Sequence, residues 1–225
     1  MAIIDYGLGN LFSIKNACET VGLQGCITFS KREIMEADAV ILPGVGAFGD
    51  AMKSLKELDL ITVLQEVSTS SKPFVGICLG MQLLMEESCE FGRHQGLGII
   101  KGSVIRFDED AGESTKHLKV PHVGWNRIYK VKRNYSEDFW PNSLLNGLAD
   151  GEFMYFVHLF YVKPKDQSLM LSMTQYGGTA FCSSFNYKNI FACQFHPERS
   201  GSGGLTIYEN LSSLLKYGSE GKLNV

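Results

Sequence analysis

The chain has 225 residues, of which 44% are hydrophobic and 20% are charged, so it can build the core of one α/β domain. Its formal net charge of −3 and the absence of a sustained basic run argue against nucleic acid as the main partner. No apolar run approaches the roughly 18 residues of a membrane-spanning helix, so we expect no membrane segment.

The first residues and the cysteines indicate the compartment. The opening MAIIDYGLGN enters an apolar run at once and carries an acidic residue, unlike a signal peptide. The six cysteines are scattered without a C-x-x-C pair, which fits neither a zinc site nor a disulfide framework. We therefore expect a cytoplasmic protein that holds no metal and no cofactor.

Strand-like and helix-like segments alternate through the first half of the chain. Apolar runs at 2–5, 37–44 and 72–78 predict strands, and stretches at 9–22, 51–68 and 79–90 predict helices. Such alternation is typical of a mostly parallel sheet with helices on both faces.

The second half contains shorter β-like runs, which we expect to add an antiparallel extension to the same sheet. These runs lie at 96–107, 153–162, 171–176, 179–187 and 190–196, before a terminal helix at 206–218. No internal repeat or linker interrupts the chain, so we expect one domain at 1–218 and a short tail at 219–225.

Cys78 is the first candidate for chemistry. It follows an apolar run, lies between Gly76 and Gly80, and precedes a helix-like stretch. This is the nucleophile-elbow pattern with sulfur in place of oxygen, and a helix N-terminus there favours thiolate over thiol. On the pentapeptide alone, an inert cysteine in a packing turn is an equally good interpretation.

A base for this cysteine is found in the segment IFACQFHPERS. His196 ends an apolar run, and Pro197 takes the chain out of the strand. Glu198 lies two residues further on and can accept an N–H bond that fixes the imidazole tautomer. Cys78, His196 and Glu198 thus form a candidate set of nucleophile, base and orienting acid.

The glycine-rich segment LPGVGAFGD supplies a third feature. A loop of this kind after a strand can present backbone N–H groups to a developing oxyanion. A tight turn or a phosphate cradle would look similar, but the lysine of a P-loop is missing and the glycines lack the context of a dinucleotide fingerprint.

These three motifs, in this order, closely resemble the class I (triad) glutamine amidotransferases. The resemblance implies a three-layer, flavodoxin-like α/β fold with a mostly parallel central sheet and an antiparallel extension. Within that class, the segments IIDYGLGNLFSI, PHVGWN and YFVH are similar to those of the glutaminase subunits of imidazole glycerol phosphate synthases. The resemblance covers nearly the whole chain.

The resemblance implies hydrolysis of L-glutamine to glutamate and ammonia. Cys78 would attack the carboxamide to form a γ-glutamyl thioester, His196 would move the protons, and Glu198 would hold the imidazole. The oxyanion would meet the N–H of Leu79 and an N–H of the loop that includes Val45 and Gly46, after a peptide flip. The residues implied to contact the substrate are Gly44, Gln82, Tyr155 and Pro197.

The resemblance also implies a partner, a (βα)8-barrel cyclase that forms a heterodimer with this chain and receives the ammonia for histidine biosynthesis. The residues implied to face the barrel are His122, Trp125, Asn126 and Arg199. We expect weak glutaminase activity in the isolated chain and strong stimulation by the partner.

One departure from the family pattern leaves alternatives open. After YFVH the family carries a small hydroxyl residue and then Tyr, whereas this chain has Leu159 and Phe160. The same glutaminase chemistry could supply ammonia for amidination of a bacterial surface sugar. A cysteine-elbow hydrolase of another specificity and a binding protein with a decayed site are further alternatives.

Overall fold

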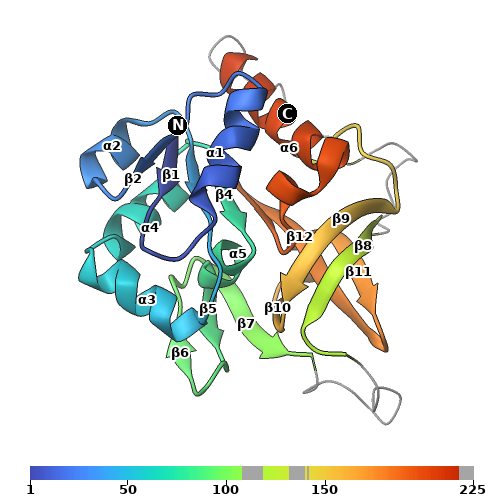
Figure 1. Cartoon of the computed structure of the whole chain (residues 1–225). Coiled ribbons are helices and arrows are strands. Elements are labelled where there is room, and N and C mark those ends of the chain that lie inside the picture. The colour runs from blue at the N-terminus through green and yellow to red at the C-terminus, as the bar shows by residue number, and fades with distance from the viewer. Residues whose placement is uncertain (108–118, 132–139, 141, 218–225) are drawn as a thin grey trace.

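The computed structural model describes residues 1–107, 119–131, 140 and 142–217; the expected tail at 219–225 lies outside them. Its main element is a nine-stranded sheet with the strand order β2-β1-β3-β4-β13-β12-β11-β8-β9 (Figure 1). The first five strands in this order are parallel: β2 (Cys26–Thr28), β1 (Ala2–Ile4), β3 (Val40–Leu42), β4 (Phe74–Ile77) and β13 (Ile190–Cys193).

Helices cover both faces of the parallel half and give it three layers. Short buried strands place alternate side chains on opposite faces. Ile4 and Leu42 contact a core shared with α2 (Lys31–Glu36), α3 (Phe48–Glu57) and α4 (Ile61–Thr69). Ile3 and Ile41 contact a second core, shared with α1 (Leu11–Thr20) and α6 (Gly201–Tyr217).

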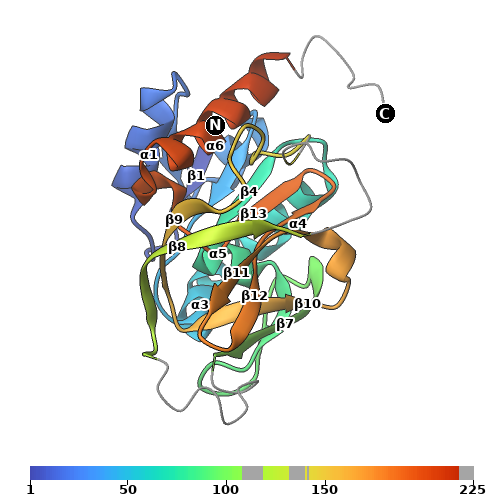
Figure 2. The same cartoon turned by 90° about the vertical axis from the view of Figure 1, so that its right-hand side faces the viewer.

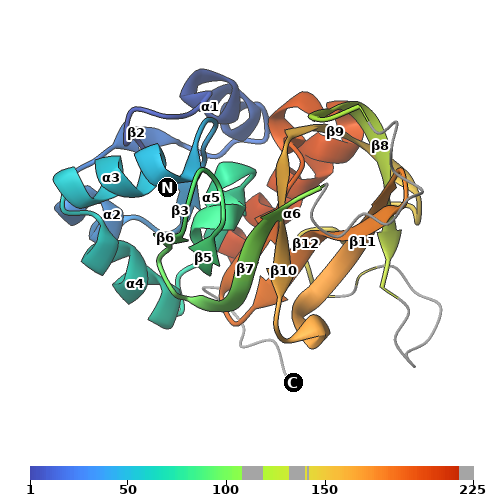
Figure 3. The ribbon, with the colours of Figure 1, turned by 90° about the horizontal axis from the view of Figure 1, so that it is seen from below.

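The other half of the sheet is antiparallel, as expected. It consists of β12 (Thr179–Tyr187), β11 (Met170–Tyr176), β8 (His122–Lys130) and β9 (Glu152–His158). Figure 2 shows β8 and β9 as a long, twisted pair. In Figure 3 the strands β8, β9, β11 and β12 lie on the right, and β2 and β3 lie on the left with α2, α3 and α4. The predicted fold class is confirmed.

A second, four-stranded sheet was not expected. Its order is β10-β7-β5-β6, and its strands are β10 (Phe160–Pro164), β7 (Ile100–Arg106), β5 (Met85–Ser88) and β6 (His94–Gln95). The run at 153–162, predicted as one β segment, divides at Leu159 into β9 and β10, which belong to different sheets.

Two predicted helices have the wrong extent. The stretch at 51–68 forms α3 and α4, because Asp59 adopts a left-handed conformation (φ 54°) that ends the first helix. The stretch at 79–90 forms α5 (Leu79–Leu83) and then strand β5, because the carbonyls of Leu84 and Met85 accept N–H groups from 98–100 instead of continuing the helix.

The remaining elements of the described residues are two 3₁₀ turns, Gln167–Leu169 and Pro197–Arg199. The terminal helix α6 begins at Gly201, five residues before its predicted start at 206. No helix in the described part of the chain is long and apolar enough to cross a membrane.

Candidate active site

Cys78 lies in a strained turn between β4 and α5. Its φ of 54° and ψ of −110° fall outside the conformations that a residue with a Cβ prefers. Two backbone hydrogen bonds hold it there: its N–H donates to the carbonyl of Cys193 (2.8 Å), and its carbonyl accepts from the N–H of Gln82 (3.2 Å). Backbone strain that the surrounding contacts hold in place is typical of a nucleophile on such an elbow.

The two flanking glycines let the elbow pack against the sheet. A Cβ on Gly80 would lie 1.8 Å from the carbonyl oxygen of Leu42, and one on Gly76 would lie 3.0 Å from the side chain of Leu84. The requirement at Gly80 is the stricter, because a backbone carbonyl of β3 cannot move aside as a side chain can.

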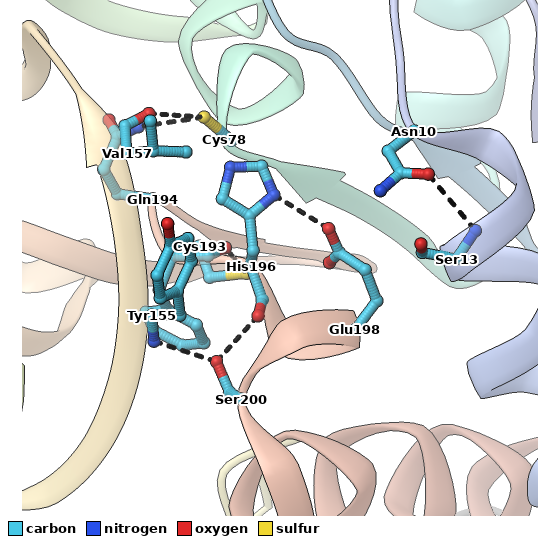
Figure 4. A network of polar contacts seen from close by, with 11 residues as sticks. Asn10, Ser13, Cys78, Tyr155, Val157, Cys193, Gln194, His196, Glu198 and Ser200 are labelled. Atoms are coloured by element: carbon cyan, nitrogen blue, oxygen red, sulfur yellow. Dashed lines mark hydrogen bonds and ion pairs between the residues drawn. The ribbon is translucent and has the colours of Figure 1, made fainter. Parts of the chain in front are cut away.

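His196 and Glu198 meet at the carboxyl end of the neighbouring strand, β13. His196 Nδ1 lies 2.8 Å from Glu198 Oε1, and both side chains are almost completely buried. Figure 4 shows the imidazole between this carboxylate and the sulfur of Cys78. Burial lowers the pKa of His196, but the adjacent Cys78 thiolate and Glu198 carboxylate raise it more, so the net pKa lies above its ordinary value. The carboxylate thus orients the imidazole, whose other nitrogen, Nε2, is buried and has no hydrogen-bond partner among the described residues.

The sulfur of Cys78 faces a cavity of about 200 Å³, smaller than the roughly 300–1,000 Å³ of drug-sized sites. The cavity is lined by Val45, Gly46, Cys78, Leu79, Gln82, Glu90, Val157, His158, Leu159 and Phe160. A larger cavity of about 500 Å³ lies at the opposite ends of β4 and β13. Its lining contains no Cys, His, Asp or Glu, so the smaller cavity is the candidate active site.

The residues expected to supply the oxyanion donors line this cavity. Leu79 N–H donates to the carbonyl of Gly44 at 3.3 Å, and Val45 and Gly46 line the cavity beside it. Rotation of the peptide that joins Gly44 to Val45 would replace this carbonyl with the Val45 N–H. The oxyanion role of these groups stays a prediction.

Tyr6 is a support of this loop that the sequence did not reveal. Its hydroxyl donates to the carbonyl of Pro43 at 2.7 Å, and a Cβ on Gly44 would lie 2.1 Å from the same hydroxyl oxygen. Gly44 thus lets the loop pass over Tyr6, which accounts for the glycine at this position.

Gln82 enters the cavity from α5. Its Nε2 donates to the carbonyl of Phe160 (3.0 Å) and to Oε1 of Gln194 (3.0 Å). Because these two contacts use both amide hydrogens, Oε1 is the atom that remains for a ligand. Gln194 Nε2 in turn lies 3.6 Å from the sulfur of Cys78.

Glu90 is a cavity residue that sequence reasoning missed. Its carboxylate is 8% exposed and accepts a hydrogen bond from the N–H of Phe48 at the start of α3 (2.6 Å). Burial raises the pKa of this carboxyl, and the Phe48 N–H opposes the rise. A buried carboxylate in the cavity is suited to the ammonium group of an amino acid.

The other expected substrate residues, Gly44, Tyr155 and Pro197, are not in the lining of the cavity. Tyr155 packs edge-on to Trp125, and the guanidinium of Arg199 lies 5.1 Å from the centre of its ring. Its carbonyl accepts from the N–H of His196 at 2.9 Å. Pro197 is buried and begins the 3₁₀ turn after His196. Their substrate roles stay predictions.

The expected partner residues divide between a surface and the layer beneath it. Trp125 is 56% exposed on the outer face of the β8–β9 hairpin, Arg199 is exposed nearby, and Asn126 is partly buried. His122 is only 3% exposed and lies beneath this face. Further exposed apolar side chains on the same two strands are Val123, Phe153 and Val157. The described residues contain no cluster of His, Cys, Asp or Glu that could hold a metal ion.

Comparisons with known proteins show the family of this chain. Residues 2–211 match the family model for class I glutamine amidotransferases. Imidazole glycerol phosphate synthase subunit HisH of Aquifex aeolicus is 46% identical over 209 residues, which covers 92% of this chain and 93% of the relative. The subunit HisH of Sulfurimonas denitrificans is 44% identical, with coverage of 94% and 97%.

Solved structures share the fold at lower sequence identity. PurLQS of Thermotoga maritima aligns with a TM-score of 0.68 at 16% identity and covers 95% of this chain and 97% of its own. The glutaminase domain of Trypanosoma brucei CTPS, solved with bound acivicin, has a TM-score of 0.62 at 14% identity, with coverage of 99% and 94%. On the family match and the HisH relatives, the chain belongs to the class I glutamine amidotransferases.

Proposed function

We propose that this chain is the glutaminase subunit of an imidazole glycerol phosphate synthase, which acts in histidine biosynthesis. The observation that carries the chemistry is the buried set of Cys78, His196 and Glu198 at the edge of a cavity of about 200 Å³. The 46% and 44% identity with two HisH subunits supports this pathway over amidination of a surface sugar.

The first half of the reaction forms a thioester. Cys78 gives its proton to His196, and the thiolate attacks the carboxamide carbon of glutamine. Two backbone N–H groups, from Leu79 and from Val45 after the peptide flip, stabilise the oxyanion. His196 then protonates the departing nitrogen, and ammonia leaves the γ-glutamyl thioester.

The second half regenerates the thiol. His196 takes a proton from a water molecule that attacks the thioester carbon, and the tetrahedral intermediate collapses to glutamate and the Cys78 thiolate. Glu198 holds the imidazole in one tautomer throughout and stabilises its cationic form. Glu90 and the Oε1 of Gln82 are acceptors suited to the ammonium group of glutamine.

The partner that receives the ammonia is a (βα)8-barrel cyclase seated on the outer face of β8–β9. Exposed aromatic and apolar side chains on this hairpin support the assignment. The engaged Leu79 N–H supports low activity of the isolated chain, because its carbonyl partner occupies the position of an oxyanion donor. Partner binding would favour the flipped peptide.

Substitution of Cys78 tests the function directly. Release of glutamate from L-glutamine should fall to background in Cys78→Ala, with the partner present or absent. The matched control is Cys26→Ala, since Cys26 is an exposed free cysteine on β2, away from the cavity. Turnover that survives in Cys78→Ala would exclude the thioester mechanism, and turnover lost in both variants would exclude a specific role for Cys78.

A further inference from the structure

Two buried histidines that this mechanism does not use lie side by side on the β8–β9 hairpin. His122 and His158 are register partners on the two strands and are 3% and 6% exposed. A buried imidazole needs partners for both ring nitrogens. Here those partners form a continuous chain of hydrogen bonds that leads to the cavity.

The direction of each hydrogen bond in this series can be assigned from its end at the cavity, where His158 contacts Phe160. His158 Nδ1 lies 2.8 Å from the carbonyl oxygen of Phe160, so this nitrogen carries a proton and donates it. In a neutral ring Nε2 then accepts, and its neighbour at 3.0 Å, His122 Nδ1, must donate. His122 Nε2 in turn accepts from the side-chain amide of Asn126 at 3.2 Å.

The surroundings keep both rings neutral. The ring of His122 stacks between Phe156 and Tyr176, with centroids 4.9 and 4.0 Å away, and the buried Phe107 contacts both histidines. Burial among these rings lowers the pKa of His122 to about 4 and the pKa of His158 to about 3. Near neutral pH each ring therefore has one donor nitrogen and one acceptor nitrogen, as the series of hydrogen bonds requires.

The Phe160 carbonyl, at the cavity end of this series of hydrogen bonds, also contacts Gln82, the candidate substrate residue. The carbonyl of Phe160 accepts from His158 Nδ1 and from Gln82 Nε2 (3.0 Å). Phe160 and Gln82 both line the cavity. This carbonyl and Oε1 of Gln194 are the two acceptors that hold Gln82 Nε2, and so they determine which end of the Gln82 amide faces a ligand.

We propose that His122 and His158 are positioning residues for glutamine: they hold the Phe160 carbonyl, and through it the Gln82 amide, so that Gln82 Oε1 faces the substrate ammonium group. The inference rests on the proposed glutaminase function and adds to it a series of hydrogen bonds that joins β8 to the substrate residue Gln82. Asn126, partly buried on the hairpin, lies at the outer end of this connection.

Binding of L-glutamine in a Cys78→Ala background tests the proposal without turnover. His122→Phe keeps a ring between Phe156 and Tyr176 but removes both nitrogens. We expect the Kd for glutamine, measured by calorimetry, to rise about fivefold or more, the effect of a weakened hydrogen bond to a charged group. His122→Asn, whose amide can donate from the Nδ1 position, should restore most of the affinity.

A double-mutant cycle separates positioning from a general structural effect. In a Gln82→Met background, His122→Phe should change the Kd less than about twofold, because the group that it positions is gone. Additive effects, or an unchanged Kd in a folded His122→Phe protein, would overturn the proposal. A Cys78→Ala parent that does not bind glutamine would instead remove the proposed function, and this inference with it.

Nitrogen NMR of the unsubstituted protein provides a test that does not depend on the folding of a variant. With ¹⁵N-labelled histidine, the proposal predicts neutral Nδ1–H tautomers for both His122 and His158 near pH 7. A protonated ring, or an Nε2–H tautomer at either position, would break the donor sequence and overturn the proposal.

Discussion

At the scale of single residues, the proton on His196 is controlled by two negative neighbours. Burial lowers the pKa of the imidazole, whereas the thiolate of Cys78 and the carboxylate of Glu198 raise it more. The stability that the imidazolium gains from these neighbours is complete below the ordinary histidine pKa. It is lost as the pH rises through the higher pKa of the folded state.

Glu198→Gln should therefore shift the pH dependence of the enzyme. Glutamine keeps the shape of the side chain but removes one negative charge, so the pKa of His196 falls. We expect the alkaline limb of kcat/KM to move about one pH unit or more to lower pH. We expect kcat to fall about 100-fold or more, because the tautomer is no longer enforced.

The matched control for this measurement is Glu209→Gln, which neutralises an exposed carboxylate on α6. Its pH profile should coincide with that of the unsubstituted chain. An alkaline limb that stays in place in Glu198→Gln would mean that Glu198 does not set the pKa of His196.

At the scale of elements, strand β9 holds the segment that carries the catalytic base. Tyr155 N–H donates to the hydroxyl of Ser200 (3.0 Å), which donates to the carbonyl of His196 (2.7 Å). The carbonyl of Tyr155 also accepts from the N–H of His196 (2.9 Å). These three contacts form a closed ring between β9 and the turn after β13, and Figure 4 shows the two that Ser200 makes.

Ser200→Ala should loosen this ring and misplace the base. Ser200 is buried, so the variant leaves a donor and an acceptor without their partner, at a cost of about 1–3 kcal/mol in the free energy of unfolding. We expect kcat to fall about tenfold with little change in KM, because the base moves while the glutamine pocket remains. Ser202→Ala, at an exposed position on α6, is the control. Equal kinetics for the two variants in glutaminase assays would show that the ring does not position His196.

Local sequence patterns predict only those elements whose structure is decided locally. The strand before Cys78 and the turn after His196 were predicted, because apolar runs, glycine and proline act within a few residues. The length of α5 was not, since N–H groups of 98–100 take the carbonyls that would have continued the helix. The cavity position of Glu90 escaped notice for a similar reason: it depends on β5 and the second sheet.

Burial was the least predictable property of the candidate partner residues. His122 and Trp125 lie three residues apart on one strand, so their side chains point to opposite faces. The PHVGWN motif indicates that this segment matters, but it does not tell which face meets a partner. The sheet register, which pairs His122 with His158 and Trp125 with Tyr155, supplies that information.

At the scale of the whole molecule, the nine-stranded sheet has two edge strands that lie on opposite sides of it. Strand β9 forms one edge and borders the cavity through Val157, and strand β2 forms the other. Exposed aromatic residues lie at both edges: Trp125 on the β8–β9 hairpin is 56% exposed, and Phe29 after β2 is 61% exposed. Of the two edges, only the first borders the cavity, so the partner proposed for β8–β9 would lie next to the site of ammonia release.

The two edges provide a matched pair of variants for the partner interaction. Trp125→Ala should weaken binding of the proposed barrel cyclase about 30-fold or more, the effect of removing a central aromatic anchor. Phe29→Ala removes a similarly exposed ring from the far edge and should leave affinity unchanged. Titration of each variant with the purified partner measures the Kd, and the same samples report stimulation of glutamine hydrolysis. Because stimulation of glutamine hydrolysis requires only that the partner be bound, a saturating concentration of partner should restore stimulation in Trp125→Ala. Equal loss of affinity in Trp125→Ala and Phe29→Ala would place the interface elsewhere.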